Sequence, residues 1–473
     1  MIVLPEQGLT PLERHGLDVL VDLSRLLPAP PGLGALRLDV VEGGPVGVAG
    51  LREDPVVVEG ALRVPRNLLR TIGDLVSAAA EQGTTARDPL GRVPSAVNAM
   101  VAGGVTEEPL VSRWAIEARR AVARASVARP FRTVAPWPHA KRWAVALSHD
   151  LDVVSLWPAF TTLRLMELAG KGEWRQVART LGAAMGSLLG DPVRDGVEQI
   201  LAVEEGLGIR STWFILCGHP TAASFRRGDL TYRPESTATR RILAALQDDG
   251  HEIGLHGSLE TAAHPDRFIV QHERLASLAP TTGRGVRQHF LRMDPGQTQR
   301  GMIHGGFEYD ATWGFSDHNG FRLGVADVVP WFETKGDSVT PLDVVPFCWM
   351  DRTQSKYEGV EIPAEWARVA LERAARCNEV EGLWCGIWHP NLTAALGYPG
   401  APEAFVTLAE GLTGDGTAWV TTLAEIVGWR RRRRTVSAVG LGAAGEVIAR
   451  AARPGLPVWL ENAAGVPQEC LES

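Results

Sequence analysis

The stretch WAVALSHDLD, residues 143–152, decides how this chain is expected to fold, because an apolar run ends there in two carboxylates. A short apolar run that stops at polar residues is typical of a buried strand. Asp150 and Asp152 stand one residue apart, and alternate side chains of an extended segment point to the same side. We therefore predict a buried strand that presents two carboxylates at its C-terminal end.

Comparable apolar runs follow along the chain and alternate with amphipathic helices. The further runs cover residues 210–218, 251–257, 285–292, 342–351, 382–390 and 418–423. Apolar residues at helical spacing cover Ser236–Gln247 and Ala364–Cys377 between them. Strands that alternate with helices predict an α/β fold with a parallel sheet, either open or closed into a barrel.

Ionisable side chains lie at or just past the C-terminal ends of these expected strands. They are Asp150, Asp152, His256, His289, Asp351 and His389. Parallel α/β barrels build their active sites at this edge of the sheet. A single buried histidine or a single aspartate after a strand is usually structural, but the set as a whole favours a site.

The residue types point to metal-assisted hydrolysis. A carboxylate with two imidazoles suits Zn²⁺ or a related divalent ion that keeps an open position for water and substrate. Such an ion acidifies water and polarises the carbonyl under attack. The second aspartate then stays free as a base, and a separate histidine can protonate a departing amine.

Five motifs, in order and spacing, resemble those of the polysaccharide deacetylase family in its divergent Asp-x-Asp branch. They are SHDLD (148–152), STWFILCG (211–218), HEIGLHGS (251–258), GVRQHFLR (285–292) and IWHPN (387–391). The resemblance spans roughly residues 142 to 425 and implies a distorted (β/α) barrel. It also implies a hydrolase acting on carbon–nitrogen bonds, which removes an N-acetyl or similar acyl group from a saccharide.

The resemblance implies a role for each matching residue. Asp150 matches the catalytic base, Arg287 the residue that orients it, and His389 the general acid. Asp152 and His256 match metal ligands. The substrate-binding positions that we assign are Phe290, whose backbone N–H would hold the oxyanion, Trp349 and Asp351. Asp351 either fixes the tautomer of His389 or caps a helix.

One departure from the family's pattern concerns the third metal ligand. The usual second histidine lies four residues after the first, where this chain has Glu260. His289, His264 and Glu260 itself are the available replacements, and we favour His289. If none of them ligates, the chain would be a metal-independent carbon–nitrogen hydrolase on the same barrel, or a catalytically inactive barrel that binds glycans or partners.

The expected cofactor is one divalent metal ion, zinc first, with cobalt or nickel as alternatives. The expected partner is an N-acetylated saccharide of surface polysaccharide or glycan metabolism. A biosynthetic intermediate in which this saccharide is linked to a nucleotide or a lipid is one form that fits. The net charge of -7 argues against nucleic acid as a partner. The sequence does not indicate an oligomeric state.

The first residues and the cysteines bear on location. The N-terminus lacks the basic and long apolar regions of a signal peptide, and no stretch approaches the roughly 18 apolar residues of a membrane span. Five scattered cysteines without a CxxC pair favour a reducing compartment. A cytoplasmic protein is therefore expected.

The flanks carry no recognisable chemistry. Residues 1–135 are expected to form a separate α+β region, with strands at 35–41 and 56–58, helices at 68–81 and 110–127, and a linker at 131–139. The barrel would cover 142–434, and 435–473 would form a small β appendage. We expect the arginines at 430–434 to be a solvated helix end. The glycine-rich segment 305–324 either lines the substrate cleft or closes over the barrel structurally.

Overall fold

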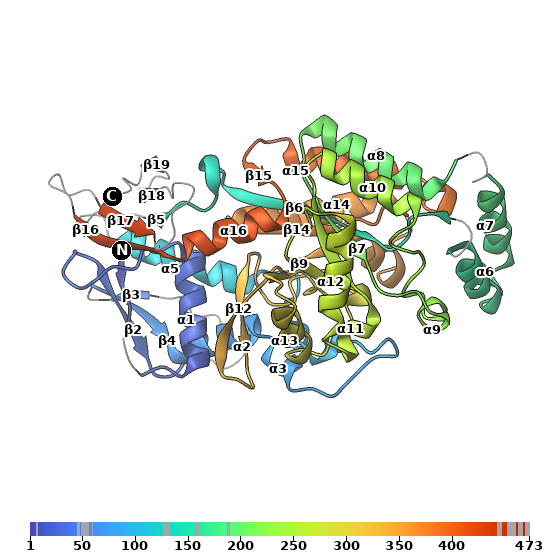
Figure 1. Ribbon diagram of the computed structural model, residues 1–473. Helices are drawn as coiled ribbons and strands as arrows, with labels where there is room; N and C mark the ends of the chain where they lie inside the picture. Colours follow the sequence, from blue (N-terminus) through green and yellow to red (C-terminus); the bar gives the residue numbers. More distant parts are fainter. Residues whose placement is uncertain are drawn as a thin grey trace.

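The computed structural model describes residues 1–5, 8–44, 48, 56–58, 60–125, 133–156, 160–186, 190–441, 447–451, 460–461 and 467–468. Two larger sheets organise these residues, one near the termini and one around the predicted site (Figure 1). Among the described residues, no helix is both long enough and apolar enough to span a membrane.

The first sheet has four strands in the order β1-β2-β4-β3. The strands are β1 (Ile2–Val3), β2 (Leu36–Val41), β3 (Val56–Val58) and β4 (Ala61–Pro65). The helices of this region are α1 (Pro11–Ser24), α2 (Arg66–Val76), α3 (Ala79–Gln82), α4 (Ala99–Ala102) and α5 (Leu110–Ala125). Thr10 starts α1 with a capping box, in which its side chain accepts from the Glu13 N–H and Glu13 binds back to the Thr10 N–H.

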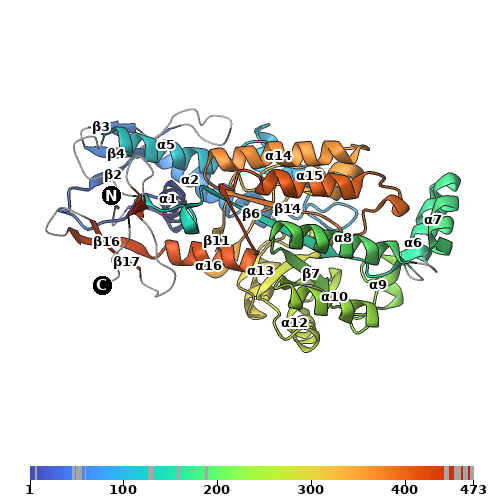
Figure 2. The same cartoon turned by 90° about the horizontal axis from the view of Figure 1, so that it is seen from above.

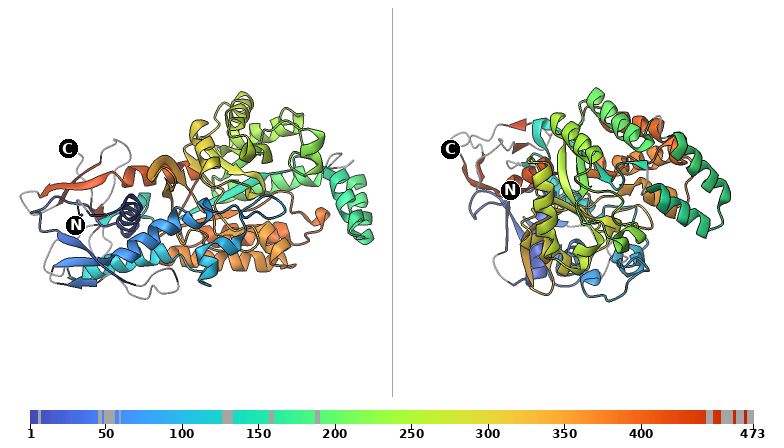
Figure 3. Two further views of the ribbon diagram at one scale, coloured as in Figure 1. Left: turned by 90° about the horizontal axis from the view of Figure 1, so that it is seen from below. Right: turned by 45° about the vertical axis from the view of Figure 1, so that its right-hand side comes forward.

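The second sheet has ten strands and curls into an incomplete barrel (Figure 3). Its order is β11-β12-β10-β9-β8-β7-β6-β14-β13, with β15 also paired to β6. Every pairing in it is parallel except that of β11 with β12. The strands are β6 (Trp143–Leu151), β7 (Thr212–Leu216), β8 (Glu252–Gly257), β9 (Gly285–Gln288), β10 (Tyr309–Asp310), β11 (Val329–Glu333), β12 (Ser338–Val344), β13 (Trp349–Met350), β14 (Leu383–Ile387) and β15 (Ala418–Val420). The distorted (β/α) barrel expected from the sequence is confirmed.

Helices connect these strands and lie outside the sheet (Figure 2). They are α6 (Thr161–Gly170), α7 (Trp174–Gly186), α8 (Pro192–Leu207), α9 (Ala222–Arg226), α10 (Thr237–Asp248), α11 (Leu259–Ala263), α12 (Arg267–Leu278), α13 (Gln297–His304), α14 (Pro363–Glu379), α15 (Ala401–Thr413) and α16 (Leu423–Arg433). The predicted helical stripe of α14 is buried at Trp366, Ala370, Ala374 and Cys377. All nine residues of β6 are buried as well, so its apolar run is a core strand.

Two of the predicted elements are interrupted in the structure. The strand expected over 342–351 is interrupted between β12 and β13, where Pro346 has no N–H to donate to a ladder. Before the break, β12 pairs with β10. After it, β13 pairs with β14 at the other end of the sheet. The helix expected over 68–81 is broken at Ala78, whose φ of 49° lies in the left-handed region.

The prediction for the arginine run at the end of α16 is wrong. Arg430 has no exposed surface, and it pairs with Asp22 of α1 and with Asp327 at 2.9 and 2.7 Å. Arg431 and Arg434 both pair with Asp343 of β12. Because these acids come from distant parts of the chain, spacing within the run could not identify them. The run joins the N-terminal region to the barrel instead of facing solvent.

The segment expected as a linker is packed where the structure describes it. Trp137 is fully buried and donates from Nε1 to the Glu381 carbonyl at 2.9 Å. Residues 131–132 lie outside the described part. Beyond α16, β16 (Val436–Leu441) and β17 (Val447–Ala451) pair antiparallel, and β18 (Leu460–Glu461) joins β19 (Pro467–Gln468) and β5 (Thr133–Val134). The rest of the expected C-terminal appendage lies outside the described residues.

Candidate active site

The predicted polar residues meet at the C-terminal edge of the barrel sheet. Asp150 is the last residue but one of β6, Asp152 follows the strand directly, His256 belongs to β8, and Arg287 belongs to β9. His289 follows β9, Asp351 follows β13, and His389 lies two residues beyond β14. Parallel strands place these ends side by side, so residues far apart in the sequence converge there.

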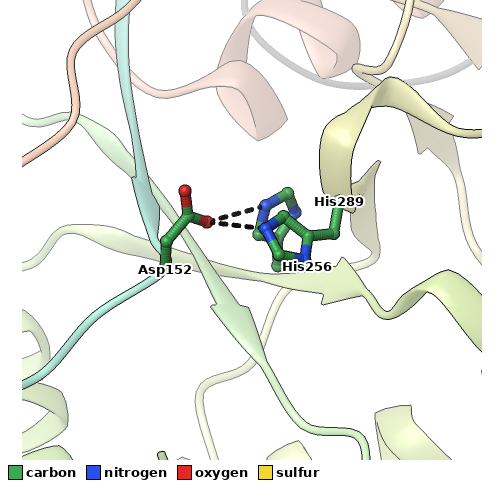
Figure 4. Close-up of side chains that lie close together, drawn as sticks. All are labelled: Asp152, His256 and His289. Atoms are coloured by element: carbon green, nitrogen blue, oxygen red, sulfur yellow. Dashed lines mark ion pairs between the residues drawn. The ribbon is translucent and has the colours of Figure 1, made fainter. Parts of the chain in front are cut away.

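Three side chains form a compact cluster of potential metal ligands (Figure 4). One ligand atom each of Asp152, His256 and His289 lies within 4.8 Å of the others. Asp152 Oδ1 is 3.3 Å from His256 Nε2 and 3.5 Å from His289 Nε2. Figure 4 shows both rings turned toward this carboxylate oxygen.

Hydrogen bonds behind the two rings fix which nitrogen faces the cluster. His256 Nδ1 lies 2.8 Å from the Arg287 carbonyl oxygen, and His289 Nδ1 lies 3.0 Å from Asp229 Oδ1. Both partners are acceptors, so each Nδ1 donates a hydrogen and each Nε2 is left to point at Asp152. Asp229 also accepts from the Leu259 N–H, which holds its carboxylate in place.

Asp152 Oδ1 supports the same interpretation. It is buried and has no hydrogen-bond partner among the described residues. Burial raises the pKa of Asp152, but His289 and His256 outweigh that effect and hold the pKa far below its ordinary value. A buried ionised oxygen without a hydrogen bond is costly unless a cation satisfies it. The donor set, one carboxylate and two imidazoles, fits a divalent metal.

Asp150 is held beside the cluster by a buried arginine. Arg287 has no exposed surface, and its Nη1 donates to Asp150 Oδ1 at 2.7 Å. Its Nη2 donates to Ser148 Oγ at 2.9 Å, and its guanidinium lies 4.3 Å from the Phe214 ring centre. Burial raises the pKa of Asp150, but Arg287 outweighs it, so the pKa lies below its ordinary value. Asp150 is therefore an anion able to accept a proton.

His389 reaches Asp152 from the other side of β6: it follows β14, whereas His256 and His289 come from β8 and the end of β9. Its Nδ1 lies 2.6 Å from Asp351 Oδ1, and its backbone N–H donates to Asp351 Oδ2 at 2.6 Å. His389 Nε2 is 3.7 Å from Asp152 Oδ2. Burial lowers the pKa of His389, but Asp351 outweighs that and raises the pKa to about 9. The ring can therefore carry a proton at neutral pH.

The other candidate ligands lie elsewhere. Glu260 Oε1 accepts from Gln271 Nε2 at 3.2 Å, and neither Glu260 nor His264 belongs to the cluster. His264 is exposed at the end of α11. Of the three replacements considered for the missing histidine, the structure brings only His289 to Asp152 and His256.

The three residues assigned to substrate binding differ in their surroundings. Phe290 is half-buried with a φ of 55°, and its ring stacks on His289 with 4.1 Å between ring centres. Asp351 is fully buried and holds His389, so it acts through that ring. Trp349 has no exposed surface and lies between Trp384 and Trp388, so its assignment to substrate contact is corrected to a core position.

The glycine-rich segment 305–324 is mainly structural. Asp310 is fully buried and accepts from Gln299 Nε2 at 2.9 Å and from Trp313 Nε1 at 3.0 Å. Arg322 is buried against Glu81, which ties the segment to α3. Of the two roles considered for this segment, these contacts favour the structural one, in which it closes over the barrel, over lining the substrate cleft.

Two residues of the site were missed by the sequence analysis. Ser148 receives Arg287 Nη2, and Asp229 receives His289 Nδ1. Ser148 belongs to the SHDLD motif, which is the one signal that could have identified it. Asp229 stands in a turn between α9 and α10 with no motif around it.

Comparisons with known proteins give structural matches only. No protein-family model and no curated protein matches the chain. A Mycobacterium smegmatis protein described as a polysaccharide deacetylase is 22% identical, with a TM-score of 0.42 over 62% of this chain and 92% of that chain. Puue allantoinase is 15% identical, with a TM-score of 0.43 over 62% and 92%. A Pseudomonas aeruginosa PAO1 protein, also described as a polysaccharide deacetylase, is 14% identical, with a TM-score of 0.44 over 64% and 95%. Polysaccharide deacetylases are thus among the solved structures that match. At these identities no residue role is transferred from them.

Proposed function

We propose that this protein is a metal-dependent hydrolase that removes an N-acetyl or similar acyl group from a saccharide. The observation that carries the proposal is the convergence of His256 Nε2 and His289 Nε2 on Asp152 Oδ1, a buried oxygen without a hydrogen bond. A proton acceptor and a proton donor flank this cluster, as hydrolysis of an amide requires.

In this proposal Asp152, His256 and His289 hold the ion. Zinc suits the one-carboxylate, two-imidazole set, and cobalt or nickel would also fit it. When bound, the ion supplies a Lewis acid that polarises the acyl carbonyl and acidifies water. Asp229 keeps the His289 ring oriented through the 3.0 Å contact at Nδ1.

The chain's own residues manage the protons. Asp150 takes a proton from the attacking water, because Arg287 keeps its carboxylate ionised at 2.7 Å. His389 gives a proton from Nε2 to the departing amine, because Asp351 binds its Nδ1 at 2.6 Å and stabilises the protonated ring. The two groups therefore begin in opposite protonation states, as an acid–base pair must.

Phe290 is the proposed substrate contact. The ring is half-buried and rests on His289, so it lies directly beside the cluster. Its exposed part can pack against the apolar face of a sugar. The backbone N–H of the same residue would stabilise the oxyanion, which in comparable sites is worth several kcal/mol.

Release of acetate from N-acetylated oligosaccharides tests the proposal. The protein reconstituted with Zn²⁺, Co²⁺ or Ni²⁺ should release acetate and a free amine in equal amounts. Asp150→Asn should lower kcat at least about 100-fold while the metal content stays unchanged. Equal activity in Asp150→Asn would rule out the assigned base. Activity that survives exhaustive chelation would instead indicate a metal-independent carbon–nitrogen hydrolase.

A further inference from the structure

A helical hairpin of α6 and α7 projects from the active-site edge of the barrel. It is inserted after β6, the strand that ends in Asp150 and Leu151, and it occupies the end of the molecule opposite both termini (Figures 1 and 2). Helix α7 also packs against the turn at Ala394–Leu396, which follows His389. The hairpin therefore lies beside the loop that follows His389.

Large apolar side chains of this hairpin face solvent. Trp174 is 67% exposed, Leu181 46% and Met185 74%. Their spacing of seven and four residues, with Ala178 between them, places them along one face of α7. None of the described side chains of α7 is buried. On α6, Met166 is 62% exposed.

Exposed apolar side chains concentrate on this edge of the molecule. Among the described residues, only Met166, Trp174, Met185 and Ile362 are large apolar side chains more than 60% exposed. Ile362 lies in the connection from β13 to α14, which leaves the same C-terminal edge of the sheet as α6 and α7. Exposed apolar residues gathered on one edge mark a surface that binds something.

The charges beside the apolar face indicate the kind of surface that it meets. Arg175 and Arg179 are exposed along one flank of α7, and neither forms an ion pair with a described residue. Residues 160–186 hold four cationic and two acidic side chains, in a chain whose net charge is -7. An apolar stripe bordered by arginines is the pattern of a helix that lies in an anionic membrane interface.

We propose that the α6–α7 hairpin docks the active-site edge of this protein onto an anionic lipid surface. Trp174, Leu181 and Met185 enter the interface, Met166 and Ile362 lie at its rim, and Arg175 and Arg179 meet lipid phosphates. The docking does not depend on the proposed reaction. Its consequence, that the saccharide substrate is carried on a lipid, rests on the proposed function.

Sedimentation of the full-length protein with vesicles tests the docking. The protein should bind vesicles containing phosphatidylglycerol more strongly than vesicles of phosphatidylcholine alone, and added salt should weaken the difference. The double variant Trp174→Ser, Met185→Ser should bind the anionic vesicles at least about tenfold more weakly. The variant Arg175→Gln, Arg179→Gln should lose most of the preference for anionic lipid. Leu207→Ser is the matched control, because Leu207 is 37% exposed at the end of α8, on the opposite edge of the barrel.

Three results would overturn the docking. They are absence of binding to phosphatidylglycerol vesicles, equal binding by the Trp174→Ser, Met185→Ser variant, and a self-association without lipid that this variant abolishes. Hydrolysis of a water-soluble acetylated oligosaccharide is measured in parallel and should be unchanged in the variant. A wild-type protein that hydrolyses the saccharide but does not bind anionic vesicles refutes the docking alone, whereas vesicle binding without hydrolysis in any protein refutes the proposed function alone.

Discussion

Replacing Arg287 with methionine removes the cation that holds Asp150. Arg287 is fully buried and donates to Asp150 Oδ1 at 2.7 Å and to Ser148 Oγ at 2.9 Å. Methionine leaves a carboxylate that is only 4% exposed without its counterion. Breaking a buried ion pair by removing one partner costs about 3–5 kcal/mol, so the free energy of unfolding should fall by about that amount at neutral pH.

The effect of Arg287→Met on stability should depend on pH in a defined direction. Burial raises the pKa of Asp150, but in the wild type Arg287 outweighs it and holds the pKa below 3.8. The stabilisation from the ionised carboxylate is therefore present above the unfolded-state pKa and lost as pH falls through the lower folded-state pKa. Without Arg287, the pKa of Asp150 should rise, because burial is then opposed only by the smaller effects of His256 and His389. The difference between the two proteins should be largest near neutrality and shrink as Asp150 becomes protonated.

Urea unfolding of both proteins between about pH 4 and pH 7 measures this difference. Arg284→Met is the control, because Arg284 is exposed near the start of the same strand and donates to the Gly306 carbonyl at a long 3.3 Å. That variant should change the free energy of unfolding by no more than about 0.5 kcal/mol. An Arg287→Met protein as stable as the wild type, or a gap that is constant with pH, would refute the reasoning.

Three further changes separate the proposed roles. Asp351→Asn removes the anion that raises the pKa of His389 to about 9, so the alkaline limb of kcat/KM should move to lower pH; an unmoved limb would show that Asp351 does not set this pKa. His389→Gln should lower kcat by about 10²–10⁴-fold with the metal content retained, and loss of the metal would make His389 a ligand instead of an acid. Asp229→Ala should weaken metal affinity by about 10–100-fold by releasing the ring of His289, which a titration of the metal-free protein against Zn²⁺ would measure; unchanged affinity would argue against that positioning role.

The sequence predicted the barrel because each strand repeats the same local pattern. An apolar run such as Trp143–Leu151 ends in polar residues, and the parallel arrangement then brings those ends together. The convergence of Asp150, Asp152, His256 and His289 follows from that arrangement. The parallel sheet and the position of the site at its C-terminal edge could therefore be predicted from the sequence alone.

Features that depend on tertiary partners could not be predicted in this way. Asp229 orients His289 from a turn without a motif, and the arginines after Trp429 pair with acids from α1 and β12. The substrate-binding role expected for Trp349 depends on exposure, and the ring instead packs among other tryptophans. Pro346, by contrast, was a visible reason to divide the strand expected over 342–351. The cytoplasmic location stays a prediction.

The most direct test of the central claim is the metal content of the purified protein by elemental analysis, with Asp152→Ala, His289→Ala and His264→Ala in parallel. The cluster predicts about one divalent metal per chain in the wild type and in His264→Ala, with loss in Asp152→Ala and His289→Ala. Loss in His264→Ala, or no metal in any protein after incubation with Zn²⁺, Co²⁺ or Ni²⁺, would contradict the site proposed here.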